Sequence, residues 1–148
     1  MKQGTITTSV FGAALGLAGL AGPALAQDNM AYIGASLFGE QEVGHEGAGE
    51  EASGDFSAEL DLAKGRMCYM LEVEGLDTFT AAHIHEGAIG KEGPPVVSLQ
   101  LLGEDGDDVC VAVDAELLKK IARNQSRFYV NVHTEAFPAG AVRGQLSE

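Results

Sequence analysis

The segment Ala81-Ala82-His83-Ile84-His85-Glu86-Gly87 alternates histidine with apolar residues and ends in glycine. A period of two is typical of a β-strand, in which successive side chains point to opposite faces. His83 and His85 therefore share one face, about 7 Å apart along the strand, and Ile84 points to the other. The segment predicts a half-buried strand that carries two imidazoles.

A second segment of this kind, Tyr129-Val130-Asn131-Val132-His133-Thr134, lies near the end of the chain. Its two valines share one face, and its tyrosine, asparagine and histidine share the other. If the valine face packs in the core, His133 projects outward as His83 and His85 do. Adjacent strands about 5 Å apart would then bring the three rings together. We therefore expect a metal site formed by His83, His85 and His133.

The rest of the chain predicts an all-β domain with one short helix. Apolar alternation recurs in short runs separated by Gly, Asp, Glu and Pro, a spacing typical of sandwiches and barrels. The expected strands span residues 30–38, 55–62, 66–74, 80–86, 95–102, 108–113, 127–134 and 140–146. The expected helix spans residues 115–122, with Asp114 as its N-terminal cap.

The first 26 residues are expected to be a secretory signal peptide. Lys2 precedes an apolar run over residues 10–21, which is too short for a membrane span, and Ala24-Leu25-Ala26 fits the cleavage rule. Cleavage after Ala26 would leave residues 27–148 as one domain. We expect a periplasmic or secreted protein with no stable membrane insertion.

The composition is strongly acidic. The formal net charge is −13, and removal of Lys2 lowers it by one more unit. Such a protein should repel nucleic acid and anionic lipid headgroups. The acidic, glycine-rich residues 39–54, which include His45, are expected to form a solvated loop. Residues 103–108 are expected to form a turn, because they lack the ligand spacing of a calcium loop.

The two cysteines, Cys68 and Cys110, suit a disulfide in an exported protein. Each alternates against apolar neighbours and so lies on the less apolar face of its expected strand. This matching parity permits a bridge but does not establish one. Two separately buried thiols are the alternative.

Several motifs together resemble the CHRD family, a domain named after chordin and also found in exported bacterial proteins. The resemblance rests on His83-Ile84-His85-Glu86, on residues 90–97, on the Tyr129 to Thr134 segment and on the closing residues 137–146. It extends back to Ala35-Ser36-Leu37-Phe38-Gly39-Glu40-Gln41-Glu42-Val43. The resemblance implies an immunoglobulin-like Greek-key β-sandwich or barrel similar to copper/zinc superoxide dismutases.

The dismutase resemblance applies residue by residue only in part. Gly75-Leu76 precedes the His83 motif, and Val132-His133 and Arg143 look like the later dismutase elements. Pro95, however, stands where a dismutase has its bridging histidine. The resemblance therefore implies three copper-type ligands and no zinc site.

One copper ion is the expected cofactor, with zinc as the alternative, because nitrogen ligands bind copper most strongly. Water, His45 or a nearby carboxylate would fill a fourth position. Asn131 and Arg143 are expected to contact the ligand histidines without binding the metal. For Arg143, an ion pair with Glu135 or another acid is the favoured alternative.

The sequence leaves three functions open. The first is a non-enzymatic exported domain that binds a transition metal for storage, delivery or sensing. The second is a protein-binding or adhesion module whose histidines form a hydrogen-bond network with backbone carbonyls. The third is a superoxide dismutase-like redox enzyme.

Overall fold

The computed structural model describes residues 29–100 and 109–148. In this part of the chain, strands alternate with short loops and one α-helix. The strands are β1 (Met30–Phe38), β2 (Ser53–Asp61), β3 (Arg66–Glu74), β4 (Phe79–Glu86), β5 (Pro95–Leu99), β6 (Val109–Ala112), β7 (Phe128–Thr134) and β8 (Val142–Gln145). The helical elements are α1 (Ala115–Arg123) and the 3₁₀ turns η1 (Gly39–Gln41) and η2 (Gln125–Arg127).

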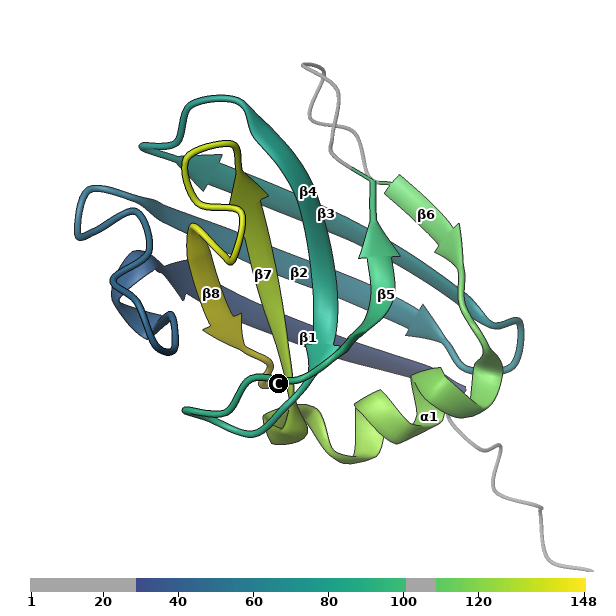
Figure 1. The fold of residues 1–148 in the computed structure, drawn as a ribbon. Helices are drawn as coiled ribbons and strands as arrows, with labels where there is room; N and C mark the ends of the chain where they lie inside the picture. Colours follow the sequence, from purple (N-terminus) through teal and green to yellow (C-terminus); the bar gives the residue numbers. More distant parts are fainter. Residues whose placement is uncertain (1–28, 101–108) are drawn as a thin grey trace, which may run out of the picture.

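The strands form one antiparallel sheet in the order β5-β4-β7-β8-β1-β2-β3-β6. The sheet curls into a nearly closed barrel, so that β1, β2 and β3 lie behind β4, β7 and β8 (Figure 1). β3 pairs with β6 and β4 pairs with β7, so the chain crosses between the two halves as in Greek-key folds. The expected all-β fold is confirmed.

The core lies between the two halves of the curled sheet. Period-two alternation buries every second residue, as in β1, where Ile33, Ala35 and Leu37 point inward. Ile84 of β4 and Val130 of β7 meet this core with no exposed surface. The expected strands at 30–38 and 66–74 match β1 and β3 end to end, and the others differ at their ends by a few residues.

Helix α1 closes one end of the barrel (Figure 1). The Asp114 side chain caps it by accepting hydrogen bonds from the N–H groups of Glu116 and Leu117. Leu118 and Ile121 are fully buried against the sheet. The helix and its cap were correctly predicted.

The structure joins Cys68 of β3 and Cys110 of β6, which lie directly opposite each other, by an S–S bond of 2.07 Å. The predicted signal peptide at residues 1–26 and the predicted turn at 103–108 lie outside the described residues. Within the described part, no helix is long and apolar enough to cross a bilayer.

The disulfide predicts a measurable contribution to stability. It closes a long loop, with its cysteines 42 positions apart in sequence, and should therefore lower the entropy of the unfolded chain. We expect Cys68→Ala/Cys110→Ala to lower the free energy of unfolding by about 3–4 kcal/mol in urea titrations. Reduced wild type should unfold like the variant. Equal stability of oxidised wild type and variant would contradict the bridge.

Candidate metal centre

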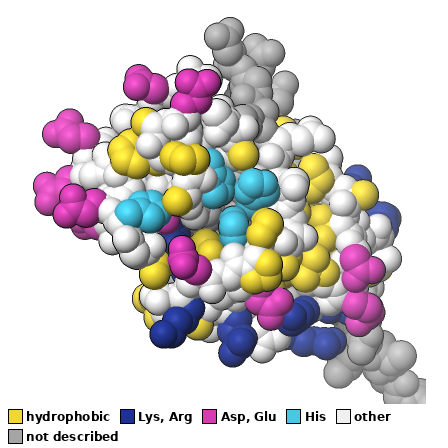
Figure 2. All heavy atoms as spheres, in the orientation of Figure 1, with side chains coloured by type: hydrophobic (Ala, Val, Ile, Leu, Met, Phe, Trp, Pro, Cys, Tyr) yellow, Lys and Arg dark blue, Asp and Glu magenta, His cyan; other side chains and the backbone are white. Residues whose placement is uncertain are grey.

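The pairing of β4 with β7 brings the three histidines together. In this register His83 lies opposite Asn131, His85 opposite Tyr129, and Ala81 opposite His133. His133 is therefore diagonal to His83 on the face that points away from the core. In the space-filling view, histidine side chains gather near the centre of this face, with acidic side chains along its left edge (Figure 2).

One ring nitrogen from each of His83, His85 and His133 lies within 4.8 Å of the other two. Among residues 29–100 and 109–148, no other group of three or more His, Cys, Asp or Glu side chains has the geometry to hold a metal ion. The ring centroid of His83 lies 5.6 Å from that of His85 and 5.2 Å from that of His133. The rings are thus edge to face rather than stacked.

Backbone carbonyls orient two of the three rings. His85 Nδ1 lies 2.9 Å from the Gly93 carbonyl oxygen, and His133 Nδ1 lies 3.2 Å from the Pro138 carbonyl oxygen. Because a carbonyl can only accept, each Nδ1 must carry the proton and donate. The Nε2 atoms of both rings then present lone pairs. This is how metal-binding histidines are commonly oriented.

Each of the three rings also has a buried nitrogen that lacks a hydrogen-bond partner. His85 Nε2, His133 Nε2 and His83 Nδ1 are shielded from solvent and make no hydrogen bond. A buried polar atom in this state costs about 1–3 kcal/mol. Three such atoms in one cluster indicate a missing partner, and a cation suits three nitrogen donors.

Electrostatics favours the neutral rings that a metal requires. Burial lowers the pKa of His85 and is the largest influence; the hydrogen bond with Gly93 opposes it. Burial also lowers the pKa of His133, followed by repulsion from His83. Both shifts favour the neutral ring, in which Nε2 keeps its lone pair for a metal.

Tyr129 and Arg143 stack behind His85. The Tyr129 ring lies parallel to the His85 ring, with centroids 4.9 Å apart, and the Arg143 guanidinium carbon is 3.4 Å from the Tyr129 centroid. β7 lies between β4 and β8, so imidazole, phenol and guanidinium form three successive layers. Arg143 thus supports the imidazole of His85 through Tyr129.

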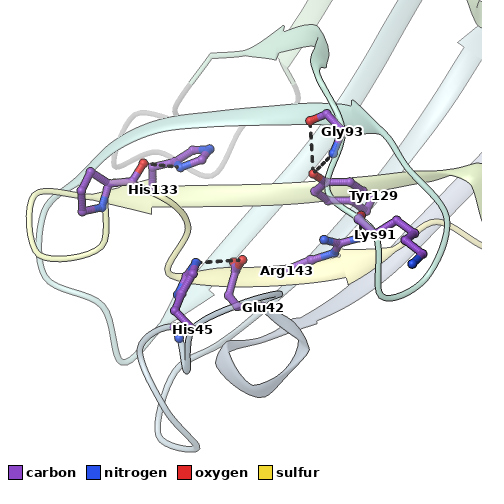
Figure 3. A network of polar contacts seen from close by, with 9 residues as sticks. Glu42, His45, Lys91, Gly93, Tyr129, His133 and Arg143 are labelled. Carbon is purple, nitrogen blue, oxygen red and sulfur yellow. Dashed lines mark hydrogen bonds and ion pairs between the residues drawn. The ribbon is translucent and has the colours of Figure 1, made fainter.

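The sequence offers an ion pair of Arg143 with Glu135 or another acid as an alternative role. Among the described residues no ion pair joins Arg143 to Glu135, and the acids whose charges act on Arg143 are Glu42 and Glu92. Arg143 is buried and donates instead to the carbonyls of Lys91, at 2.8 Å, and Ala88, at 3.4 Å. These carbonyls belong to residues 87–94, the loop whose Gly93 carbonyl holds His85. Figure 3 shows Arg143 below Tyr129 and beside Lys91. The arginine therefore anchors the loop that orients the His85 ring.

Residues 39–54 are not merely the solvated loop that the sequence predicted. Gly39 and Gly47 are buried, and the Ala48 N–H donates to the carbonyl of Ala141 beside β8. The Glu42 side chain is 3% exposed. Together with residues 87–94 and 135–141, this loop covers the outward face, so the imidazoles are half-buried or buried.

Glu42 is the polar residue of this region that sequence reasoning missed. Burial raises its pKa to about 7, against the opposing influences of the Arg143 charge and of hydrogen bonding from Asn131. Its Oε1 atom is buried without a hydrogen bond. Glu42 falls within the CHRD-like motif at residues 35–43, the one signal that set it apart from its acidic neighbours.

His45, one of the candidates for a fourth ligand, is not part of the cluster. Its Nδ1 accepts a hydrogen bond from the Gly47 N–H at 3.1 Å, and its Nε2 lies 3.8 Å from Glu42 Oε2 (Figure 3). The other carboxylate near the motif, Glu86, points away and pairs with Lys120 at 2.7 Å. Among the described His, Cys, Asp and Glu residues, none joins the three histidines as a fourth ligand.

These features describe an all-β domain with a histidine cluster under three loops. Comparison with protein families matches the CHRD domain over residues 33–146. The chain therefore belongs to the CHRD domain family. The comparisons with curated proteins and with solved structures found no match.

The role of Arg143 can be tested with Arg143→Lys. Lysine cannot keep both the ring stacking and the two carbonyl bonds, so we expect the free energy of unfolding to fall by about 2 kcal/mol. Amide hydrogen exchange in residues 87–94 should accelerate. Arg123→Lys, at an exposed position of α1, is the control and should change neither quantity. Unchanged exchange in Arg143→Lys would refute the anchoring role.

Glu42 predicts a specific dependence of stability on pH. Its pKa rises from 4.5 to about 7 on folding, so the folded state holds its proton more tightly than the unfolded state. The resulting stabilisation is present below pH 4.5 and is lost as pH rises through about 7. Between pH 5 and 8, metal-free wild type should lose about 2 kcal/mol more unfolding free energy than Glu42→Gln.

Urea titrations of both proteins at several pH values measure this difference. His85 and His133, whose lowered pKa values make stability rise with pH, are present in both and cancel in the comparison. Parallel pH profiles for wild type and Glu42→Gln would show that Glu42 titrates normally.

Proposed function

We propose that this CHRD-domain protein is exported and binds one transition-metal ion through His83, His85 and His133. Two observations support the proposal: one nitrogen of each ring lies within 4.8 Å of the other two, and each ring has a buried nitrogen without a hydrogen-bond partner. Copper is the proposed ion and zinc the alternative. The proposed role is storage, delivery or sensing of the metal, without catalysis.

The donor set fits such an ion once the rings move together. Metal–nitrogen bonds of about 2.0–2.1 Å at tetrahedral angles place ligand nitrogens about 3.4 Å apart. From the observed limit of 4.8 Å, the nitrogens must approach by about 1 Å on metal binding. Nitrogen ligands suit both copper and zinc, and copper forms the stronger complexes within the divalent series.

The competing structural role rests on a specific observation. His85 and His133 each hold a different loop, through Gly93 and Pro138. Loop anchoring uses only Nδ1 in each ring, and it leaves the buried Nε2 atoms and His83 Nδ1 unexplained. A metal site accounts for both nitrogens of His85 and His133 and for Nδ1 of His83, which is why we favour it over a domain that only binds a protein partner.

A binding role is preferred to a dismutase-like one because of Arg143. Copper would supply one-electron redox chemistry, but a dismutase also needs a positive charge that attracts its anionic substrate. Here Arg143 is buried, and its guanidinium is used on the carbonyls of Lys91 and Ala88. The chain as a whole is strongly acidic.

Export is supported by two features of the sequence. Residues 1–26 have the charge, apolar run and small-residue ending of a signal peptide. The pairing of Cys68 with Cys110 suits an oxidising compartment. We propose the periplasm or the extracellular space as the location of residues 27–148.

Calorimetric titration of residues 27–148 with Cu(II) and Zn(II) tests the metal site. Wild type should bind one ion per chain. His83→Ala/His85→Ala and His133→Ala should each weaken binding by about 100-fold or more, a loss of about 3 kcal/mol. His45→Ala is the matched control, since it removes a histidine from the adjacent loop, and should bind within about threefold of wild type.

Two outcomes would overturn the proposal. One is the lack of saturable one-site binding to the wild type. The other is an equal loss of affinity in His45→Ala and in the cluster variants, because binding would then depend on total histidine content rather than on this geometry.

A further inference from the structure

Buried polar atoms without a hydrogen-bond partner also occur outside the three histidines. Among the described residues, two oxygen atoms beside the cluster share this property, Glu42 Oε1 and Asn131 Oδ1. A buried carboxyl with an unsatisfied oxygen is costly and calls for a physical reason. The proposed metal function does not by itself give one.

Charged and polar groups from four segments act on Glu42: its own loop, residues 87–94, β7 and β8. On its own loop His45 Nε2 is 3.8 Å from Oε2. Arg143 of β8 and Glu92 of residues 87–94 act on it through their charges, and Asn131 of β7 by hydrogen bonding. Around Gly140, an added Cβ would lie 2.5 Å from Glu42 Oε1 and 2.7 Å from Asn131 Nδ2, which shows how closely this space is filled.

Two residues connect Glu42 to the histidine cluster. Asn131, which hydrogen-bonds Glu42, lies directly opposite His83 in the β4–β7 register, on the same face. Arg143 interacts electrostatically with both Glu42 and His85. We expect a charge on the histidines to act on the Glu42 carboxyl, because burial of this carboxyl weakens solvent screening.

The metal-free protein and a bound cation favour opposite states of this carboxyl. Burial disfavours the carboxylate and raises the pKa of Glu42 to about 7, so that near neutral pH the acid is partly protonated. A divalent cation on neutral imidazoles adds two positive charges nearby and favours the carboxylate. Cation binding and ionisation of Glu42 must then assist each other.

We propose that Glu42 is the counter-ion of the metal centre, neutral when the histidines hold no ion and ionised when they do. The O–H bond of the carboxyl breaks as the divalent cation binds, and the proton passes to solvent. This inference rests on the proposed metal function and adds a residue to it. Glu42 is a positioning and charge-balancing group, and the ligands remain the three histidines.

Calorimetry with Zn(II) in two buffers of different ionisation enthalpy measures the protons released per ion bound. At pH 7, wild type should release about half a proton more than Glu42→Gln, because a group with its pKa near 7 is about half protonated there. The excess should fall towards zero at pH 8.5. Glu42→Gln should also bind Zn(II) about tenfold more weakly at pH 8.5.

Glu46→Gln is the matched control. It removes one exposed carboxylate from the same loop, and so it tests the effect of total charge without touching the buried group. It should release as many protons as wild type. Equal proton release by wild type and Glu42→Gln, with Zn(II) bound to both, would overturn the counter-ion role. If wild type binds no Zn(II) or Cu(II), the metal function itself fails.

Carbon-13 NMR of the wild type keeps the test independent of variant folding. At pH 7, Zn(II) should move the side-chain carboxyl resonance of Glu42 to the position of an ionised carboxylate. An unchanged resonance on saturation with Zn(II) would overturn the proposal even if Glu42→Gln failed to fold.

Discussion

The site depends on the antiparallel pairing of β4 with β7. This register places His83 and His85 beside His133, and the buried partners Ile84 and Val130 secure it, because a slip by one residue would turn the imidazoles into the core. The same strands end at the loops whose carbonyls orient the rings. The positions of the three imidazoles thus follow from core packing rather than from flexible side chains.

The outward face of this strand pair is a partly desolvated compartment. Residues 39–54, 87–94 and 135–141 cover it, and Arg143 and Tyr129 link the covering loops to the sheet. Burial lowers the pKa of His85, and so favours its neutral form, and it strengthens interactions between charges beneath the loops. It also places a carboxyl group, Glu42, where its charge is costly until a cation is present.

Local pattern predicted most of the strands, the helix cap at Asp114 and the shared face of the histidines, since alternation and capping depend on neighbours in sequence. It did not predict which loops cover that face. The burial of Glu42 and the carbonyl partners of Arg143 arise from contacts between segments far apart in the chain. Alternation likewise predicted where the imidazoles point, but not the carbonyl that fixes the tautomer of His85.

The most direct measurement of the central claim is nitrogen-15 NMR of the imidazole rings during titration with Zn(II). The account predicts that Nδ1 of His83 and Nε2 of His85 and His133 take the shifts of metal-bound nitrogen, whereas Nδ1 of His85 and His133 stays protonated. Binding through His45, or through the Nδ1 atom of His85, would contradict it.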